Sequence, residues 1–453
     1  MRIVTEADAL TDKIMGEQEY EEKSSYRLLS WCAFLDYENG RLLHNYMTGE
    51  TLFFDAKEDF ESSDTKKALI KKWFMVPEES DDVELLEELR AAMKLFDNRE
   101  GVDSYKILTT TDCNARCFYC YELGIKKENM TEETARKSAD YILRSSGDSK
   151  VTLAWFGGEP MMNPKVIDII CGALKDNKKE YASVMTSNGY LFDEDTVKRA
   201  TDEWNLKNIQ ITLDGTKEVY NRVKAYAEND DNPFGRVLKN IHLLSDAGVR
   251  VNIRLNLSLE NGDDILRLIN ELGREFKDND NVSAYVSGLF QETLKTDACF
   301  KKELSEKLIE ASNALSKNGL TGSKFTRLHT RAGGCMADSD NHRGISPSGR
   351  LMKCEHFIYD RLVGSIDEGD DKEAIEGWKK RMPDGRLCGT CVVRPVCYRL
   401  EGCPVSHPCD EFEQKEFILR KEKQLLKNVE IAEAEKKIIE DTDLTDSSED
   451  EIC

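Results

Sequence analysis

Several features common in other classes of protein are absent or scarce in this sequence. No uninterrupted apolar run reaches the ~18 residues of a membrane-spanning helix. Lys and Arg number 64 against 86 Asp and Glu, and the resulting net charge of −22 argues against a nucleic-acid groove, which needs cations to neutralise phosphates. No basic and then apolar export segment follows Met1. We therefore expect a cytoplasmic protein whose cysteines are reduced thiols.

The composition is that of a globular chain that is rich in cysteine. With 40% hydrophobic and 33% charged residues among 453, the sequence can bury several cores, and its length suggests about three domains. The 14 cysteines are unevenly placed, because eight of them lie from Cys335 onward. In a reducing compartment such clusters are expected to be metal ligands rather than disulfides.

The most informative of these clusters is Cys113-x3-Cys117-x2-Cys120. Three thiolates on one short loop can hold three irons of a 4Fe-4S cubane, and the fourth iron is then open to a small molecule. A zinc site would usually pair a C-x2-C or C-x4-C half with a matching half, which this spacing does not provide. Exposed clusters of this kind are sensitive to oxidation, so we expect an anaerobic setting.

The first hundred residues predict a small separate unit. Apolar and aromatic runs flank Glu38-Asn39-Gly40 and Thr48-Gly49, and Asn-Gly is the strongest hairpin signal. Helical patterns follow near 65–73 and 81–96. We predict a winged α+β unit over 1–100 that binds a peptide, with a plain structural extension as the alternative.

From Tyr105 the pattern becomes a repeat of strand and helix. Longer amphipathic stretches, such as Glu132–Arg144 and Asp193–Trp204, separate the strand-like runs. Six such repeats predict parallel strands joined by right-handed crossovers, hence an α/β fold with a partial (β/α)6 barrel over 101–320. Ligands of such sheets bind beyond the carboxyl ends of the strands, where the cysteine triplet follows the first strand. The predicted strands are 105–110, 151–156, 182–186, 209–213, 251–257 and 282–290.

After about residue 320 the regular alternation ends. Residues 321–425 are rich in Gly, Pro and Cys, as expected where metal ligation replaces a large apolar core. Glu440–Glu451 contains seven acidic residues and no basic one. We predict a disordered acidic tail over 426–453.

The triplet, with Tyr119 before its last cysteine, resembles the signature of the radical S-adenosylmethionine (SAM) superfamily. Segments at the ends of the next strands resemble further family motifs, including Gly157-Gly158-Glu159-Pro160, although Tyr220, Asn221 and Lys224 stand where the family often has His, Asp and Arg. A strand arginine such as Arg254 is a candidate for the SAM carboxylate, with a salt bridge as the alternative. The resemblance implies SAM binding by Tyr119, Gly157, Gly158, Glu159, Ser187, Asn188, Asp214 and Arg254.

The later cysteines resemble the SPASM extension, which carries two auxiliary 4Fe-4S clusters. The resemblance assigns Cys388, Cys391, Cys397 and Cys409 to one cluster, and Cys335, Cys354 and Cys403 to the other. A zinc ribbon is the rival interpretation, but seven cysteines exceed one zinc site.

Two positions beside these ligands stay open. The fourth ligand of the second cluster is His329, Cys299 or absent. Glu355, directly after Cys354, stands where sulfatase-maturing relatives place an acidic base, so it is a candidate catalytic base, with a surface carboxylate as the alternative.

The resemblance implies reductive cleavage of SAM to a 5′-deoxyadenosyl radical that abstracts a C–H hydrogen. We expect a precursor peptide with a leader as substrate, a thioether or related cross-link as product, and flavodoxin or ferredoxin as electron donor. An anaerobic sulfatase maturase that makes formylglycine is the close alternative. A non-catalytic, zinc-dependent peptide-binding scaffold is the alternative from another class.

Overall fold

The computed structural model describes residues 1–22, 24–60, 62–96, 101–228, 230–295, 297–322, 325–333, 335–378, 387–397 and 409–446. The chain folds as two compact units. The barrel unit comprises Arg99–Ser323 and Cys335–Arg381, and the N-terminal unit comprises Met1–Asn98, Lys324–Gly334 and Met382–Cys453. Across the described residues, no helix combines the length and apolarity that a bilayer span requires.

The barrel unit is built on six parallel strands in the order β12-β11-β10-β9-β8-β7. Alternating side chains are buried along them, as in β9, because successive residues of a strand face opposite sides of the sheet. The predicted partial barrel is confirmed, except that the last strand ends before Phe290. The strands are β7 (Ser104–Thr110), β8 (Val151–Gly157), β9 (Tyr181–Ser187), β10 (Leu206–Leu213), β11 (Arg250–Leu257) and β12 (Val282–Gly288).

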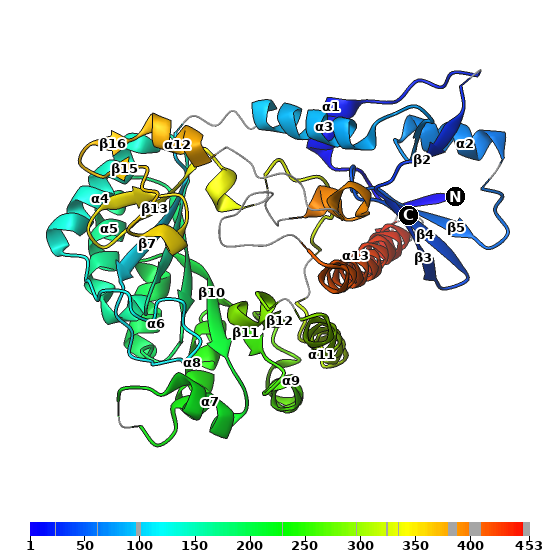
Figure 1. Cartoon of the computed structure of the whole chain (residues 1–453). Coiled ribbons are helices and arrows are strands. Elements are labelled where there is room, and N and C mark those ends of the chain that lie inside the picture. Colours follow the sequence, from blue (N-terminus) through cyan, green and yellow to red (C-terminus); the bar gives the residue numbers. More distant parts are fainter. Residues whose placement is uncertain are drawn as a thin grey trace, which may run out of the picture. The chain divides into compact units, whose positions relative to one another are not determined.

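Amphipathic helices alternate with these strands and pack against one side of the sheet (Figure 1). In α9, Ile265, Leu268, Ile269 and Leu272 are buried at helical spacing, so this helix presents one apolar face to the core. The helices are α4 (Glu132–Ser145), α5 (Pro164–Asp176), α6 (Glu194–Asp202), α7 (Lys217–Lys224), α8 (Pro233–Asp246), α9 (Gly262–Phe276), α10 (Phe290–Thr293) and α11 (Ala298–Lys317).

The same sheet continues past β7 into the cysteine-rich region. Strand β13 pairs in parallel with β7, and β14, β15 and β16 follow as antiparallel neighbours. Residues 335–378 therefore group with the barrel, whereas we expected them in a separate segment over 321–425. These elements are η2 (Met336–Asp338), β13 (His342–Ile345), β14 (Arg350–Met352), η3 (Glu355–Phe357), β15 (Gly364–Ser365), β16 (Gly369–Asp370) and α12 (Lys372–Trp378).

The N-terminal unit contains a four-stranded antiparallel sheet in the order β1-β5-β4-β3. Strands β3 and β4 form the hairpin predicted at Glu38-Asn39-Gly40, with Tyr37 opposite Gly40. The elements are β1 (Arg2–Thr5), α1 (Ala9–Met15), β2 (Tyr26–Leu28), β3 (Cys32–Tyr37), β4 (Gly40–Asn45), β5 (Thr51–Asp55), α2 (Ser63–Lys71), β6 (Met75–Pro77) and α3 (Asp82–Phe96).

The core of this unit is completed by residues from the far end of the sequence. Phe417, Leu425 and Val429 of helix α13 (Glu411–Asp446) are buried in it, together with Val393 and Val396. Two short 3-10 helices, η4 (Cys388–Thr390) and η5 (Arg394–Val396), bear the adjoining cysteines. Residues 426–446 of the predicted disordered tail are thus helical, and within them Val429 is buried in the core of this unit.

Candidate active site

The cysteine triplet forms a loop directly after β7. Cys120 N–H donates to the Cys117 carbonyl at 3.1 Å, and Ala115 N–H donates to Cys113 Sγ at 3.4 Å. The three thiols are in no disulfide, and burial raises the pKa of Cys113 to about 12. Among described residues no group of His, Cys, Asp or Glu converges on a single metal ion. A cubane does not need such convergence because each thiolate binds a different iron, so the donor set fits the cluster.

Two glycines let the end of β8 approach this loop. Gly157 has a φ of +130°, and a Cβ on it would lie 2.1 Å from the Thr110 carbonyl oxygen. A Cβ on Gly158 would lie 2.3 Å from the Asp112 carbonyl oxygen. Only residues without side chains fit here, so both glycines hold the backbone of β8 against the start of the cysteine loop.

Glu159 ties the ends of β8 and β9 together. It is fully buried and accepts hydrogen bonds from Ser187 Oγ at 2.8 Å and from Asn188 N–H at 2.7 Å. Burial raises the pKa of Glu159, although these donors oppose the shift. Asn188 also reaches the cysteine loop, since its Nδ2 donates to Asn114 Oδ1 at 2.7 Å. Three predicted SAM-binding residues thus form one network with the cluster loop, and their contact with SAM stays a prediction.

Asp214, at the end of β10, is the centre of a second buried network. Its Oδ1 accepts from Tyr119 Oη at 2.8 Å and from Asn256 Nδ2 at 3.0 Å. Its Oδ2 pairs with Lys224 Nζ at 3.0 Å. Lys224 also reaches the cluster loop, because its carbonyl accepts Arg116 N–H at 2.7 Å. The lysine that departs from the family pattern is therefore part of the site.

Arg254 lies beside this network on β11. Its Nε donates to Asn256 Oδ1 at 2.9 Å and its Nη2 to Ser287 Oγ at 3.4 Å. Within the described residues it pairs with no carboxylate, so the salt bridge that we considered as its alternative role is absent. The half-buried guanidinium of Arg254 has neutral hydrogen-bond partners, so it can still form an ion pair with the carboxylate of a bound ligand.

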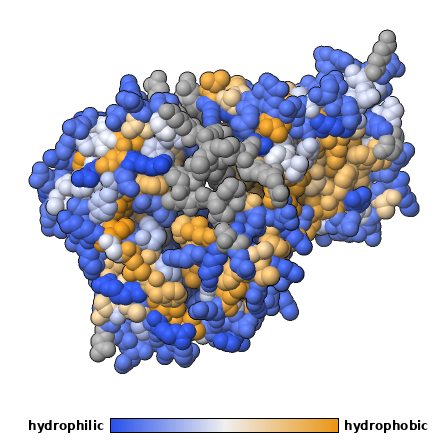
Figure 2. Space-filling model, in the orientation of Figure 1, coloured by the Kyte–Doolittle hydropathy of each residue, from blue (hydrophilic) through white to orange (hydrophobic). Residues whose placement is uncertain are grey.

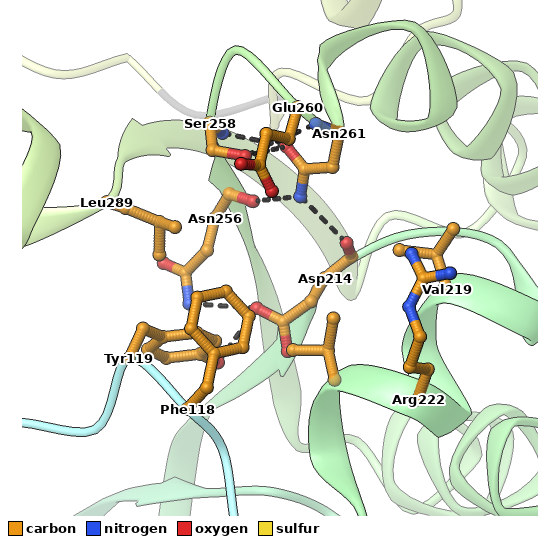
Figure 3. Close-up of a pocket in the computed structure, with 11 residues that line it drawn as sticks. Phe118, Tyr119, Asp214, Val219, Arg222, Asn256, Ser258, Glu260, Asn261 and Leu289 are labelled. Atoms are coloured by element: carbon orange, nitrogen blue, oxygen red, sulfur yellow. Dashed lines mark hydrogen bonds between the residues drawn. The ribbon is translucent and has the colours of Figure 1, made fainter.

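A pocket opens next to Asp214 (Figure 3). In the figure the rings of Phe118 and Tyr119 stand on one side of Asp214, and Val219 and Arg222 of α7 on the other. The cluster loop thus faces a cavity with a mixed polar and apolar lining. The pocket is lined by Phe118, Tyr119, Asp214, Val219, Arg222, Val223, Asn256, Ser258, Glu260, Asn261 and Leu289.

The candidate base Glu355 is held by a barrel residue. Lys106 Nζ, from β7, lies 2.8 Å from Glu355 Oε1. The other carboxylate oxygen, Oε2, is buried and has no hydrogen-bond partner in the described part of the chain. An oxygen in that state can accept a proton from a bound substrate. The side chain of Glu355 is only 14% exposed, so it is not the surface carboxylate that we considered as the alternative.

Next to Glu355, the segments of Cys120 and Cys354 meet. The rings of Tyr121 and His356 lie 4.4 Å apart, and Glu122 is close enough to Glu355 for their charges to interact. Burial raises the pKa of Glu122 to about 7, and the charge of Glu355 adds to the shift. Cys335 and Cys354, the two predicted ligands at the ends of the β13–β14 segment, are also near enough to interact.

The remaining predicted ligands lie elsewhere. Cys388, Cys391, Cys397 and Cys409 belong to the N-terminal unit, whereas Cys403 lies outside the described residues. His329 also belongs to the N-terminal unit, with its Nδ1 3.6 Å from Asp8 Oδ2. Cys299 is exposed on α11 of the barrel unit. The choice of fourth ligand stays open between these residues and an unfilled position.

Sequence reasoning missed Lys106, Glu122 and Asn256. Asn256 follows Arg254 by two positions on one strand, and that spacing alone places both on the same face. Lys106 lies in the predicted first strand, but its partner is 249 positions away in the sequence. Glu122 carries no local pattern that separates it from a solvated carboxylate.

Comparison with known proteins agrees with this geometry. Residues 107–272 match the Radical SAM superfamily, from β7 to α9. A GTP 3',8-cyclase of Clostridium perfringens is 28% identical over 308 residues, which cover 61% of this chain and 88% of the relative.

Two solved structures share the fold. One, described as native anSMEcpe with bound AdoMet, matches with a TM-score of 0.54 and 15% identity over 73% of this chain and 99% of its own. The other, Streptococcus suis SuiB bound to precursor peptide SuiA, matches with a TM-score of 0.51 and 14% identity over 86% of this chain and all (100%) of its own. The cysteine loop, the glycines at the end of β8 and the Asp214 network lie within the matched segment, and residues 107–272 are therefore a radical SAM domain.

Proposed function

We propose that this radical SAM protein modifies a precursor peptide, joining a cysteine sulfur to a carbon in a thioether or a related cross-link. The bound cluster and SAM would supply a radical that abstracts hydrogen from carbon. The pocket beside Asp214 would hold the reacting parts away from water, and Glu355 Oε2 would accept the proton that the substrate loses. The auxiliary clusters at Cys335–Cys409 would accept the electron left on the product.

The observation that carries the peptide assignment is the sheet of the N-terminal unit. Among the described strands, β3 pairs with β4 alone, so its outer edge has no strand partner. An extended peptide can add to such an edge through backbone hydrogen bonds. Figure 2 shows a hydrophobic area over β3–β5, where Phe34, Leu35 and Phe53 are only partly buried. Edge and apolar side chains together suit a leader peptide.

A substitution at Asp36 tests this edge. Because Tyr37 and Gly40 flank a two-residue loop, they exchange hydrogen bonds, and the N–H of Asp36 points outward. Asp36→Pro removes that donor without touching the β3–β4 ladder, while Asp36→Ala keeps it and serves as the matched control. We expect Asp36→Pro alone to weaken binding of a fluorescent leader peptide by about tenfold, the effect of a lost hydrogen bond of ~1 kcal/mol with local strain. Equal binding by both variants would contradict edge pairing.

Deletion of the first hundred residues is a poor test of the same idea. Val393, Val396 and α13 share the core of the N-terminal sheet, so the deletion would also expose apolar residues near the C-terminal cysteines. Point substitutions at the edge avoid that ambiguity.

The reaction is tested by mass spectrometry of the peptide product. A thioether lowers the mass by that of two hydrogen atoms and blocks alkylation of the cysteine. An aldehyde trapped by hydrazides would instead indicate formylglycine. Iron and sulfide content of anaerobically purified protein separates both from the scaffold alternative: we expect about eight to twelve irons per chain, and zinc without sulfide would exclude the enzyme.

A nucleotide substrate is the second candidate, because the Clostridium perfringens relative is a GTP 3',8-cyclase. Binding of a triphosphate depends on cations. Of the described residues that line the pocket, Arg222 is cationic, whereas Asp214 and Glu260 are acidic. This lining favours the peptide, and measuring GTP binding by calorimetry decides the question.

A further inference from the structure

The chain that leaves helix α7 turns sharply back toward the cysteine loop. Ala225 has a φ of +42°, in the left-handed region, and its N–H donates to the Asn221 carbonyl at 3.1 Å. A residue with a Cβ rarely adopts this conformation, because the Cβ then approaches the following carbonyl oxygen. Such a strained residue persists only where the contacts of its neighbours fix the backbone, so those contacts identify what holds the turn in place.

Two backbone hydrogen bonds join this segment to the cysteine loop. Arg116 N–H donates to the Lys224 carbonyl at 2.7 Å, and Ala227 N–H donates to the Asn114 carbonyl at 2.8 Å. Both loop residues lie between the first two cysteines of the triplet. The backbone between these two cysteines is therefore held by a segment that itself contains no cysteine.

Tyr226 lies between these two hydrogen bonds and anchors the segment to the barrel. Its ring stacks on that of Tyr190, just after β9, with the ring centroids 4.3 Å apart and the planes 25° apart. Its Oη lies 2.8 Å from the Oη of Tyr220 on α7. Tyr190 and Tyr220 are 2% and 0% exposed, so both partners are fixed within the barrel core.

Tyr226 is the side chain best placed to hold this segment. Of residues 224–227, which the structure describes throughout, two are alanines, and Lys224 pairs with Asp214. Opening of the segment would break both backbone bonds to the cysteine loop, so the contacts of Tyr226 set how often the loop opens. A loop that is already ordered loses less conformational entropy when its thiolates bind iron.

We propose that Tyr226 is a positioning residue of the radical-generating site. Through its contacts with Tyr190 and Tyr220 it holds segment 224–227, and through that segment it holds the cysteine loop in the shape that binds the cluster. The inference depends on the 4Fe-4S cluster at the triplet and not on the substrate that we propose. Loosening the segment should therefore weaken retention of that one cluster.

Hydrogen exchange of the full-length, iron-loaded protein, measured anaerobically, tests the first step. Tyr226→Phe keeps the ring and removes the hydroxyl contact with Tyr220, so the amides of Arg116 and Ala227 should exchange about fivefold faster. Tyr226→Leu also removes the ring stack, so exchange at the same amides should be roughly thirtyfold faster. Amides in the centre of β11 should exchange at the wild-type rate.

The cluster provides the second measurement. In the presence of an iron chelator, the electron paramagnetic resonance signal of the reduced SAM-binding cluster should decay faster in Tyr226→Phe than in the wild type, and fastest in Tyr226→Leu. Iron is expected to leave when the loop opens, so the decay should follow the order of the exchange rates. Signals of auxiliary clusters should decay at the wild-type rate.

Tyr141→Leu is the matched control, because it also removes a buried tyrosine from the barrel unit. Tyr141 is 4% exposed, its Oη donates to Asp370 Oδ1 at 2.8 Å, and its ring meets that of Tyr105 edge-on at 6.3 Å. This change should lower the free energy of unfolding but leave exchange at Arg116 and Ala227, and the decay of the cluster signal, as in the wild type.

Three outcomes would overturn the inference. If Tyr226→Leu leaves both amides exchanging at the wild-type rate, Tyr226 does not hold the segment. If exchange rises but the cluster is lost at the wild-type rate, the segment does not serve the cluster. A wild-type protein without the signal of a SAM-binding cluster would contradict the cluster and the inference with it. None of these outcomes depends on the peptide product, whose mass spectrum tests the proposed function separately.

Discussion

Replacing Lys224 by methionine removes one buried charge and keeps most of the side-chain volume. The ammonium lies 3.0 Å from Asp214 Oδ2, and the two side chains are 4% and 1% exposed. Burial opposes the charge of Lys224, but the negative charge of Asp214 acts against it, and the pKa of Lys224 is raised well above the ordinary value. The stability that Lys224 contributes through its raised pKa is therefore complete below the unfolded pKa of about 10.4 and is lost as pH rises through the folded pKa.

The size of the effect follows from the contacts. Two unit charges 3.0 Å apart attract by about 5.5 kcal/mol at an effective dielectric constant near 20. Removing one partner of a buried pair costs about 3–5 kcal/mol. Asp214 keeps its bonds from Tyr119 and Asn256, so we expect the lower end, about 3 kcal/mol. Adding Asp214→Asn should recover part of this loss, because no unpaired charge is then buried.

Urea unfolding of cluster-free protein, followed by tryptophan fluorescence, measures this loss. Trp155 and Trp204 are buried in the barrel core and report its unfolding. The matched control is Lys175→Met, which breaks an exposed ion pair with Glu203. The side chains of Lys175 and Glu203 are 54% and 58% exposed, respectively. That change should cost less than about 1 kcal/mol. If Lys224→Met lowers the free energy of unfolding no more than the control, the buried pair does not support the site.

Three further predictions concern the same unit. Arg254→Gln should weaken SAM binding about tenfold to a hundredfold in calorimetry, the loss of a charge-assisted hydrogen bond; an unchanged Kd would exclude its role. Gly157→Ala should abolish SAM binding, because its Cβ would meet the Thr110 carbonyl oxygen, whereas Gly172→Ala, where nothing is near, should bind normally. Burial is the main cause that lowers the pKa of His342 to about 3 in the folded protein. The stability that the neutral imidazole contributes is therefore present above about pH 6.5 and is lost as pH falls toward the pKa of the folded state. In urea unfolding between pH 6 and 4.5, His342→Gln should reduce the slope of stability against pH by about 1.4 kcal/mol per unit; an equal slope would show that His342 does not titrate.

The sequence was a good guide where structure depends on local periodicity. Six strands and their helices were predicted closely, because alternation and helical spacing are visible in short windows. The pairing of β13 with β7 was not predicted. Strand β13 has only four residues and its partner strand is distant in the sequence, so no short window of sequence indicates the pairing. The predicted tail was wrong over 426–446, which is helical, and its acidic composition did not indicate that Val429 is buried in the core of the N-terminal unit.

The site divides in the same way. Motifs at strand ends placed Cys113, Gly157 and Asp214 together, since parallel strands end at one edge. The part played by Lys224 depends on α7 returning to the cluster loop, which is a property of the folded chain. Glu355 was found through its neighbour in the sequence, but Lys106, which orients it, was not.

The division of the N-terminal unit between both ends of the sequence has a consequence for synthesis. Residues 1–98 leave the ribosome well before Leu425 and Val429, which complete their core. At ~5–20 residues per second the sheet waits for roughly 20–60 s while the barrel is made. During that time its apolar face lacks α13, and its β3 edge is open to other chains. The yield of folded protein in cells should therefore depend on chaperones and on the rate of translation, and not only on the stability of the finished protein.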